Sequence, residues 1–570
     1  MWWPAFLLSL VTTRVFGQSS TADAYFASET PIAKAKLLAN IGSDGSDAHG
    51  AKPGIVIASP STSDPDYLYT WTRDSALVFQ SLIDQFTHGQ DTTLRPSIEN
   101  YIAAQTILQQ VSNPSGNVST GGLGEPKFNI DLTAFTGSWG RPQRDGPALR
   151  ATALITWANY LLSTNNTSGA ASLWSILELD LDYVASNWNE TTFDLWEEVS
   201  SSSFFTTAVQ HRALRQGATL ATALGQTSSA DTYTAEADNA LCFLQSYWNP
   251  SGYMTANTGG GRSGKDANTV LTSIHTFDAA AGCDATTFQP CSDRALSNLL
   301  SYIQSFDIYA INNGIPSNQG RATGRYSEDV YYGGNPWYLT TLAVAEQLYD
   351  ALIVWNTTGS LDITAVSLPF FTNLVPGITV GTYTSGSSTF GTLTSAVKTY
   401  ADSFVGIVAK YTPADGSLSE QFTRDDGTPT SAKDLTWSYA ALLTANNARN
   451  GVTPASWGAE GLVVPTVCRE GPKPPTVAVT FNVDATTVLG ENIYLTGSVS
   501  ALQNWSPDNA LLLSAASYPT WSITVELTAS TVIEYKYIRK NNGEVTWESD
   551  PNRSFTTPAS GSYTLNDVWR

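Results

Sequence analysis

The sequence predicts two domains, a large all-α domain followed by a small all-β domain. Apolar residues recur at helical spacing from Pro31 to Gly451, whereas apolar and polar residues alternate after residue 475. Between these regions, residues 469–475 contain three prolines, which discourage helix and sheet and are typical of a short stiff linker. The length of 570 residues also exceeds the usual size of one hydrophobic core.

The helices of the first domain follow from the spacing of their apolar residues. Residues 149–161 and 337–352 show this spacing most clearly, and both segments are predicted to be amphipathic helices. Further helices are predicted at 31–41, 74–86, 97–112, 172–188, 206–224, 230–248, 292–306, 366–374, 392–411 and 437–450. An even number of antiparallel helices, here about twelve, can close into two concentric layers.

Long loops rich in Gly, Ser, Trp, Asp and Arg separate these helices. The longest are predicted at 43–73, 114–146, 307–335 and 412–436. Loops that gather at one end of a rigid helical scaffold are where a binding or catalytic site is usually built. We therefore expect the functional residues of the first domain to lie in these loops.

The second domain is predicted to consist of strands. Residues 477–483 and 523–527 alternate apolar and polar side chains, and residues 533–538 do so in part. The tripeptide Asn541-Asn542-Gly543 follows the third segment and is a turn signal. A length of roughly a hundred residues with this pattern favours a small antiparallel sandwich or barrel.

Residues 1–17 are predicted to be a secretory signal peptide, which leaves 18–468 as the α domain and 476–570 as the β domain. An apolar run from Phe6 to Val11 ends at a small glycine, as such signals do. The run is too short to span a bilayer, and no later segment reaches the roughly 18 apolar residues of a transmembrane helix. We therefore expect a secreted protein.

The composition excludes several classes of partner. Fifty acidic residues against 29 basic residues give a formal charge of -21, which repels nucleic acid and anionic membranes and favours an uncharged partner. The four histidines lack ligand spacing, so we expect no metal and no other cofactor. The four cysteines, Cys242, Cys283, Cys291 and Cys468, form no CxxC pair and predict two structural disulfides in an oxidising compartment.

Two adjacent carboxylates, Glu197 and Glu198, follow Trp196 just before a Ser-rich turn. Cleavage of a glycosidic bond requires a carboxylic acid that protonates the leaving oxygen and a second carboxylate across the bond, usually beside aromatic rings. The alternative is a pair of solvated residues at a helix end, which is the commoner situation for an isolated Glu-Glu pair. The other loops must decide between these interpretations.

Three further loops, at 65–74, 137–146 and 324–337, combine Tyr or Trp with Asp, Glu or Arg. Apolar sugar faces stack on aromatic rings, while Asp and Arg bind pairs of hydroxyl groups through charge-assisted hydrogen bonds. Taken alone, Arg73-Asp74 fits a surface ion pair that caps a helix equally well. In a fourth loop, Glu420 is either a general base that deprotonates a water or a solvated loop residue.

Together these segments resemble the glucoamylases of glycoside hydrolase family 15, of the fungal type. The residues that carry the resemblance are 67–74, 122–128, 137–150, 194–199, 325–337, 419–421 and 434–439. The resemblance implies an (α/α)6 barrel, in agreement with the helix count. It also implies an exo-acting enzyme that releases β-D-glucose from non-reducing ends of starch, glycogen and malto-oligosaccharides, with α-1,6 links cleaved more slowly than α-1,4 links.

The resemblance implies roles for individual residues: Glu197 is the general acid, Glu420 is the general base, and Glu198 is a substrate ligand. The residues implied to hold the first two sugars are Tyr67, Trp71, Arg73, Asp74, Trp139, Arg325, Tyr331, Trp337 and Gln421. The implied disulfides join Cys283 to Cys291 and Cys242 to Cys468. Spacing alone does not say which of Glu197 and Glu198 is the acid.

An inverting mechanism follows from the same resemblance. It requires the Glu197 and Glu420 carboxyl groups to lie about 6.5 to 9.5 Å apart, whereas a separation near about 5 Å would indicate a covalent intermediate. We expect Glu197 to stay protonated through burial against Trp139 or Trp196 and through nearby carboxylates, while Glu420 stays ionised. These states predict an acidic pH optimum.

The C-terminal domain resembles a starch-binding domain of carbohydrate-binding family 20. The residues that match its first sugar site are Trp505, Lys536, Trp547, Glu548 and Asn552, with the two tryptophans as stacking faces. Tyr518 and Trp521 match the second site, where Leu489 stands in place of an aromatic residue. The second site is therefore expected to be the weaker one.

Two alternatives to a glucoamylase stay open at this point. One is a starch-binding protein with weak or lost catalysis, against which the presence of both Glu197 and Glu420 argues. The other is a related barrel hydrolase of different chain specificity, which would give an oligosaccharide as its first product. In each case a monomer is the expected state.

Overall fold

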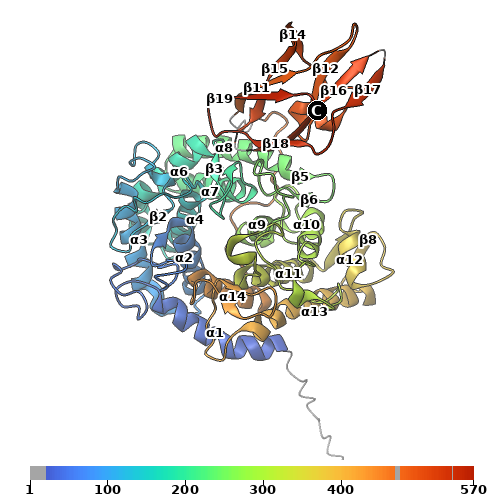
Figure 1. Cartoon of the computed structure of the whole chain (residues 1–570). Helices are drawn as coiled ribbons and strands as arrows, with labels where there is room; N and C mark the ends of the chain where they lie inside the picture. The colour runs from blue at the N-terminus through green and yellow to red at the C-terminus, as the bar shows by residue number, and fades with distance from the viewer. Residues whose placement is uncertain (1–20, 469–475, 530, 542) are drawn as a thin grey trace, which may run out of the picture.

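The computed structural model describes residues 21–468 and 476–570, apart from residues 530 and 542. The predicted signal peptide, the predicted linker and Asn542 of the predicted turn therefore lie outside the described residues. Within these ranges, no helix is long and apolar enough to cross a membrane. The chain forms a ring of helices followed by two packed β-sheets (Figure 1).

Six helices form the inner ring of the barrel. They are α2 (Thr72–Thr87), α4 (Asp145–Ser163), α7 (Phe204–Ala223), α9 (Ala267–His275), α11 (Tyr338–Thr358) and α14 (Thr436–Arg449). Each packs against the next in this order, and α14 closes the ring against α2. Most of their side chains are buried, as expected for helices that other helices surround.

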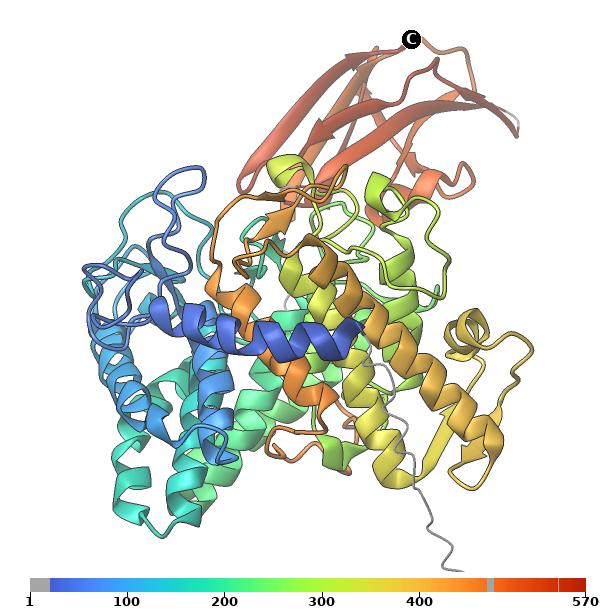
Figure 2. The same cartoon turned by 90° about the horizontal axis from the view of Figure 1, so that it is seen from below.

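An outer layer of helices covers this ring. It contains α1 (Thr21–Ala39), α3 (Arg95–Gln110), α6 (Trp174–Asn187), α8 (Thr227–Leu244), α10 (Asp293–Gln304) and α13 (Ser388–Tyr411), with the short α5 (Thr167–Ser172) and α12 (Leu368–Leu374). Figure 2 shows α1 and α13 crossing the outside of the barrel. In α13, the buried Phe390, Leu393, Val397, Tyr400 and Phe404 recur three or four residues apart and form its inward face. The predicted (α/α)6 barrel is thereby confirmed.

Two predictions about helices need correction. The sequence does not predict α9, because its nine residues are too few to show helical spacing and include the polar but buried Asn268 and Thr269. The first helix begins at Thr21, ahead of the predicted start at Pro31, because this proline lies inside the helix rather than at its first turn.

The loops that enter the six inner helices meet at one end of the barrel. The loops are residues 65–71 before α2, 137–144 before α4, 194–203 before α7, 257–266 before α9, 324–337 before α11 and 420–435 before α14. Residues from five of them line one cavity, and the loop before α9 bonds to the loop before α7. The inner ring therefore acts as the scaffold that brings distant loops together.

Two disulfides fasten the barrel, with the pairing that the resemblance implies. Cys242 of α8 is bonded to Cys468, and Cys283 is bonded to Cys291, with Cα atoms 5.7 and 4.8 Å apart. The first bond ties the last described residue of the barrel to its body. Closing so long a stretch of chain stabilises a fold by about 2 to 4 kcal/mol.

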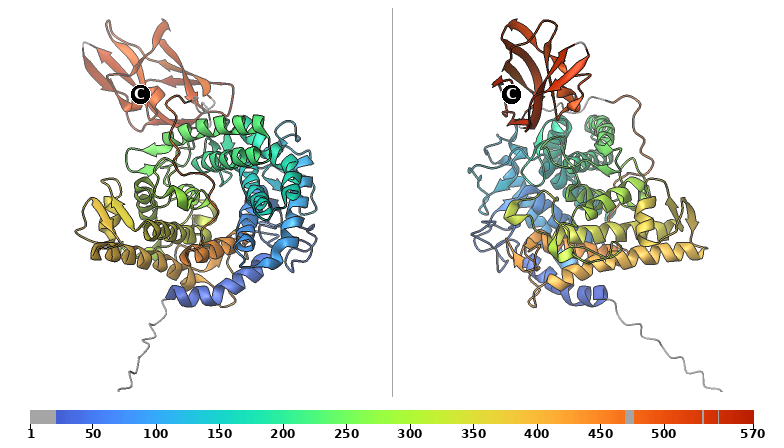
Figure 3. Two further views of the ribbon diagram at one scale, coloured as in Figure 1. Left: turned by 180° about the vertical axis from the view of Figure 1, so that it is seen from behind. Right: turned by 45° about the vertical axis from the view of Figure 1, so that its right-hand side comes forward.

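The C-terminal domain is a sandwich of two sheets, drawn in orange and red in Figure 3. One sheet has the order β14-β15-β11-β19, and the other has the order β13-β12-β16-β17 with β18 beside β16. The strands are β11 (Thr476–Asp484), β12 (Asn492–Gly497), β13 (Leu511–Leu512), β14 (Ser514–Ser517), β15 (Thr520–Thr528), β16 (Val532–Asn541), β17 (Glu544–Trp547), β18 (Arg553–Thr556) and β19 (Ser562–Val568). Alternate residues of β11 are buried, so the predicted alternation is confirmed.

Candidate active site

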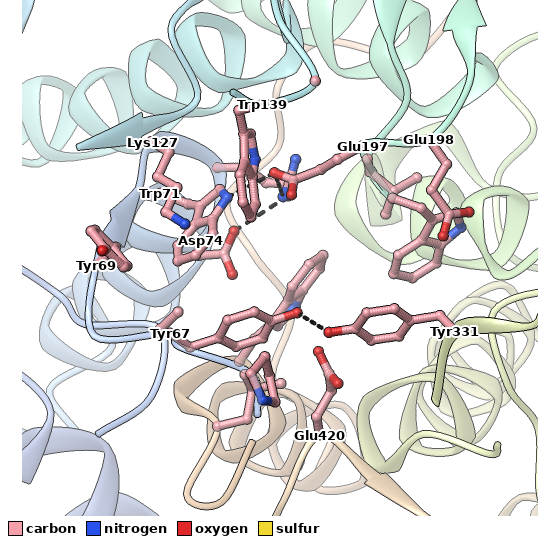
Figure 4. Close-up of a pocket in the computed structure, with 18 of the residues that line it drawn as sticks. Tyr67, Tyr69, Trp71, Asp74, Lys127, Trp139, Glu197, Glu198, Tyr331 and Glu420 are labelled. Atoms are coloured by element: carbon pink, nitrogen blue, oxygen red, sulfur yellow. Dashed lines mark hydrogen bonds and ion pairs between the residues drawn. The ribbon is translucent and has the colours of Figure 1, made fainter. Parts of the chain in front are cut away.

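One cavity of about 610 Å³ opens where the loops that enter the inner helices meet. The residues of the expected active site that line it are Tyr67, Trp71, Arg73, Asp74, Trp139, Glu197, Glu198, Arg325, Tyr331, Trp337 and Glu420. Figure 4 shows Glu197 and Glu420 on opposite sides of this cavity. The fold therefore brings together residues that the sequence distributes over five loops.

Glu197 enters the cavity from the turn between Asp194 and Val199. Its backbone φ of 67° lies in the left-handed region, which residues other than glycine rarely adopt. Its Oε1 accepts hydrogen bonds from Trp71 Nε1 at 2.7 Å and from Gln143 Nε2 at 3.0 Å. None of the described residues donates a hydrogen bond to Oε2, so Oε2 is the oxygen that can carry a proton.

Arg73 supplies a buried positive charge beside Glu197. Its guanidinium lies 3.5 Å from Glu197, 3.3 Å from Asp74 and 3.3 Å from Asp145. Arg73 is only 5% exposed, so the alternative of a surface ion pair at this position is wrong. Burial raises the pKa of Asp74 to about 6 although Arg73 opposes the shift, and Glu197 and Asp145 raise it further.

Glu198 points away from Glu197 (Figure 4). Its carboxylate accepts hydrogen bonds from Arg325 at 2.8 Å, Arg262 at 2.6 Å and the Tyr326 hydroxyl at 2.5 Å. Burial alone would raise the pKa of Glu198, but these three donors outweigh burial and lower it. The geometry therefore distinguishes the two adjacent carboxylates, which sequence spacing does not.

Glu420 lies on the opposite wall and is only 1% exposed. Its Oε2 accepts hydrogen bonds from Gln421 Nε2 at 2.9 Å and from the Ser431 hydroxyl. Burial raises the pKa of Glu420 to about 7, although Ser431 and Tyr67 lower it. This raised pKa opposes the expectation that Glu420 stays ionised in acid, because sequence patterns do not show how completely a loop carboxylate is buried.

Gln421 is the expected site residue that does not line the cavity. It is fully buried, donates to Glu420 and accepts a hydrogen bond from Asn335 Nδ2 at 3.2 Å. Its side chain therefore supports Glu420 from behind. Tyr67 and Tyr331, in contrast, face the cavity and share a hydrogen bond of 2.8 Å between their hydroxyl groups (Figure 4).

Lys127 also lines the cavity, although its sequence context did not predict a role for it. Its Nζ lies 3.6 Å from the centre of the Trp139 ring, 4.0 Å from Tyr69, 4.4 Å from Phe135 and 4.6 Å from Trp71. Burial lowers the pKa of Lys127 to about 8. The sequence could have identified Lys127 as a site residue, because Lys127 lies inside the segment 122–128 that carries the family resemblance.

Arg262 and Tyr326 are two more residues that contact the site, through Glu198, without having been predicted from the sequence. Tyr326 lies in the predicted aromatic and charged loop, so its position could have been anticipated. Arg262 follows three consecutive glycines, where no aromatic residue marks a binding loop. Its guanidinium stacks 3.8 Å from the Tyr326 ring and so reaches Glu198 in a fixed orientation.

The expected starch-binding residues divide into exposed and buried groups. Trp547 is 40% exposed and Tyr518 is 52% exposed, while Asn552 is exposed and Trp505 is half-buried. Leu489, which stands in place of an aromatic residue, is exposed as well. The buried ones are Lys536, Glu548 and Trp521. Exposed aromatic rings on a small domain are the feature that a polysaccharide surface requires.

Two of the buried residues have partners within the sandwich. Glu548 forms an ion pair with Arg553 at 2.8 Å, and the Trp521 indole donates to the carbonyl oxygen of Ala485 at 3.2 Å. With 4% exposure, Trp521 belongs to the core between the sheets. Of the two aromatic residues that match the second sugar site, Tyr518 alone presents its ring to solvent.

Comparison with known proteins covers both domains. The family described as glycosyl hydrolases family 15 matches residues 31–447, and a starch binding domain matches residues 476–567. Glucoamylase-1 of Schizophyllum commune is 64% identical over 97% of this chain and 96% of its own length. The glucoamylase of Neurospora crassa is 50% identical over 96% of this chain and 94% of its own length.

Solved structures give the same result. The family 15 glucoamylase of Hypocrea jecorina has a TM-score of 0.77 and 52% identity, with coverage of 96% of this chain and 100% of that one. The glucoamylase of Hormoconis resinae has a TM-score of 0.76 and 47% identity, with coverage of 96% and 98%. The chain therefore belongs to glycosyl hydrolases family 15 and carries a starch binding domain after its barrel.

Proposed function

We propose that this protein is a secreted glucoamylase that releases β-D-glucose from the non-reducing ends of starch, glycogen and malto-oligosaccharides. The observation that carries the proposal is the placement of Glu197 and Glu420 on opposite sides of one aromatic-lined cavity (Figure 4). The glucoamylases that match almost the whole chain support the same activity. Cleavage of α-1,4 links, with slower cleavage of α-1,6 links, belongs to this proposal.

Glu197 is proposed to act as the general acid. Trp71 and Gln143 both donate to Oε1, so the proton lies on Oε2 and passes from there to the glycosidic oxygen. The bond between C1 and this oxygen then breaks, and the shortened chain leaves as an alcohol. Arg73, 3.5 Å from Glu197, stabilises the carboxylate that proton transfer leaves behind.

Glu420 is proposed to act as the general base. Its carboxylate takes a proton from a water, and the water oxygen bonds to C1 on the face opposite to the leaving oxygen. The product is therefore β-glucose, and the water's proton ends on Glu420. Because burial raises the pKa of Glu420, the group holds this proton readily, which favours the deprotonation step.

The walls of the cavity are suited to a sugar chain. Trp71 lies with its ring centre 5.4 Å from Tyr67 and 5.9 Å from Trp139, which gives a continuous aromatic wall. Arg73 and Asp74 offer charged partners for hydroxyl groups at this wall. Rings that stack on apolar sugar faces and charges that bind hydroxyl pairs are what a neutral glucan requires.

The anomer of the first product tests the mechanism. We expect NMR to show β-glucose initially when soluble starch is incubated with the wild-type protein, and Glu420→Gln to lose this activity. Initial α-glucose would exclude inversion, and a variant with wild-type activity would exclude Glu420 as the base. An oligosaccharide as the first product would instead support the related hydrolase of different chain specificity.

The β domain is proposed to hold the enzyme on starch through Trp547 and, at a second and weaker site, through Tyr518. We expect Trp547→Ala to reduce adsorption to starch granules while hydrolysis of maltose stays unchanged. Retained adsorption would argue against this site. Secretion and a monomeric state are part of the same proposal, and N-terminal sequencing and sedimentation of protein from the culture medium test them.

A further inference from the structure

We propose that Asp266 is a positioning residue that fixes the Trp196-Glu197 segment and so directs the Glu197 carboxyl group toward the glycosidic oxygen. This inference rests on the proposed role of Glu197 as general acid. Asp266 does not line the cavity; it is the residue immediately before α9. Its effect on the reaction would therefore pass entirely through the residues that it holds.

The turn that carries Glu197 needs support from its surroundings. A non-glycine residue with φ of 67° persists only where neighbouring structure holds it there. Inside the turn, Glu197 N donates to the carbonyl oxygen of Asp194 at 2.8 Å. The Asp194 side chain accepts hydrogen bonds from Glu198 N at 3.0 Å and Val199 N at 3.1 Å. These bonds close the turn, but they do not attach it to the barrel.

The loop before α9 attaches the turn to the barrel by hydrogen bonds to every second residue of the turn. Asn257 Nδ2 donates to Asp194 at 3.0 Å, and Trp196 Nε1 donates to Asp266 Oδ1 at 2.7 Å. Arg262 donates to Glu198 at 2.6 Å. The residues on both sides of Glu197 are thus held by the segment 257–266, while Glu197 itself faces the cavity (Figure 4).

Asp266 is the rigid member of this attachment. It is 2% exposed, and the same Oδ1 accepts a hydrogen bond from Asn268 N at 2.8 Å as the cap of α9. The bond to Trp196 therefore ties the turn to the first residues of an inner helix. Loss of this acceptor would leave a buried indole N–H without a partner, which drives the ring and the adjacent Glu197 to a new position.

The expected effect of an Asp266 substitution on kcat and KM follows from the contacts that do not involve Asp266. Glu198 has Arg325, Tyr326 and Arg262 as its partners, and none of these three hydrogen bonds involves the Asp266 side chain. Binding of the substrate by Glu198 should therefore persist while the Glu197 carboxyl group is displaced. As a result, kcat should fall and KM should change little. A displacement of this kind can reduce a rate about 100-fold.

Activity on two substrates distinguishes displacement of the Glu197 carboxyl group from a general loss of active-site structure. Maltose needs a proton on its leaving oxygen, whereas the nitrophenolate of 4-nitrophenyl α-D-glucoside leaves almost without one. For Asp266→Leu, we expect kcat to fall about 100-fold on maltose and less than about tenfold on the nitrophenyl glucoside. Trp196→Phe removes the donor of the same hydrogen bond and should show the same preference between substrates.

Asp266→Asn should rescue the activity. Burial raises the pKa of Asp266 to about 7, so in mild acid the group is a neutral carboxylic acid. An asparagine reproduces its shape, its acceptor for Trp196 and its capping of α9. We expect kcat on maltose within about tenfold of the wild type, well above the value for the leucine variant.

Asp278 provides a matched control, because it is also fully buried and also caps a helix, at Ala280 N. Asp278→Leu should lower thermal stability and leave the ratio of the two activities unchanged. Equal losses of Asp266→Leu on both substrates, or no rescue by asparagine, would overturn the proposal. If Asp266→Leu does not fold, the substrate preference of Trp196→Phe decides in the same way.

Failure of this inference can be distinguished from failure of the proposed function. If Glu197→Gln still cleaves maltose at the wild-type rate, Glu197 is not the acid and both proposals fall. If Glu197→Gln is inactive on maltose while Asp266→Leu and Trp196→Phe behave as the wild type, the role of Asp266 alone is excluded.

Discussion

Glu197 and Glu420 face one cavity from opposite sides, yet different parts of the chain hold them. Glu197 receives its hydrogen bonds from Trp71 and Gln143, which lie in two other loops. Glu420 receives its hydrogen bonds from Gln421 and Ser431 within its own loop. The Glu197 side chain is 18% exposed, whereas Glu420 is buried at 1%.

This difference fits the two roles that we propose for the same chemical group. A carboxyl group that is open to the cavity on one oxygen can deliver a proton to a bound substrate. A carboxyl group that is buried among local donors is fixed in place and takes its proton from a water. Glu197 is therefore held by donors from two other loops, whereas Glu420 is oriented by Gln421 and Ser431 of its own loop together with the Tyr67 hydroxyl.

The largest expected effect comes from removing each carboxyl group in turn. Glu197→Gln and Glu420→Gln should each lower kcat on maltose by about 10² to 10⁴. With 4-nitrophenyl α-D-glucoside, Glu197→Gln should recover most of its activity, because this leaving group needs little protonation. Glu420→Gln should recover none, because the water still has to be deprotonated. If both variants recovered activity on 4-nitrophenyl α-D-glucoside, the assignment of different roles to Glu197 and Glu420 would be contradicted.

The free energy of unfolding should also respond differently to substitutions of Glu197 and Glu420. Burial raises the pKa of Glu420 from its ordinary value of 4.5 to about 7. The stability that this group contributes is therefore complete below its unfolded pKa and is lost as the pH rises through the folded pKa. Glu420→Gln should then stabilise the protein near neutral pH by on the order of 3 kcal/mol and should have little effect in acid.

Thermal unfolding at about pH 4 and about pH 7 measures this effect. The thermal unfolding of Glu197→Gln, the corresponding substitution on the opposite side of the cavity, is measured at the same two pH values as the control. A gain from Glu420→Gln that is the same at both pH values would show that burial of the charge is not its cause.

Ser431 offers a smaller test, through the pH profile. Its hydroxyl donates to Glu420 and lowers the pKa of that group. Without this donor the pKa of Glu420 rises, so the base becomes protonated at a higher pH and the acidic limb of kcat/KM moves to higher pH. Ser431→Gly is the suitable change, because Ser431 has a φ of 64°, which glycine adopts without strain.

We expect activity below the raised pKa to fall about tenfold or less, with activity at higher pH preserved. Ser119→Gly removes a hydroxyl group from an exposed loop that is not part of the cavity and serves as the control. An acidic limb that stays in place, or that moves to lower pH, would contradict the proposed coupling of Ser431 to Glu420.

The sequence was informative where function requires a distinctive residue type. The loops with Trp71, Trp139 and Glu197 combine rings and charges in patterns that a sugar-binding site requires, and all of them reach the cavity. The two-layer barrel was predictable because its long helices keep an apolar face. The structure adds Arg262, which comes from a glycine-rich loop and reaches the site only through the fold.

Burial was the property that the sequence did not provide. Glu420 and Trp521 have polar neighbours in the sequence, yet they are only 1% and 4% exposed. The same applies to Asp266, whose partner Trp196 lies in another loop. The α9 helix was missed for a related reason, since a short helix that is buried on all sides has no need of an amphipathic pattern.

The smallest expected effect concerns Lys127, on the aromatic wall beside Glu197. Its ammonium lies within 4.6 Å of the centres of the Trp139, Tyr69, Phe135 and Trp71 rings, where a cation attracts each ring face. Lys127→Met removes this attraction and frees the rings to move. KM for maltose should therefore rise about threefold to tenfold, as expected from about 0.7 to 1.4 kcal/mol of lost cation-π interaction.

Steady-state kinetics on maltose separates this role from one in the chemistry. Because the rings are proposed to bind the sugar and Glu197 to deliver the proton, kcat should stay within about twofold of the wild type. Lys127→Arg retains a cation that can stack on the same rings, so it should keep KM closer to the wild-type value. A fall in kcat of Lys127→Met with unchanged KM would mean that Lys127 acts on Glu197 itself, and the acid side would then depend on a charge as well as on its hydrogen bonds.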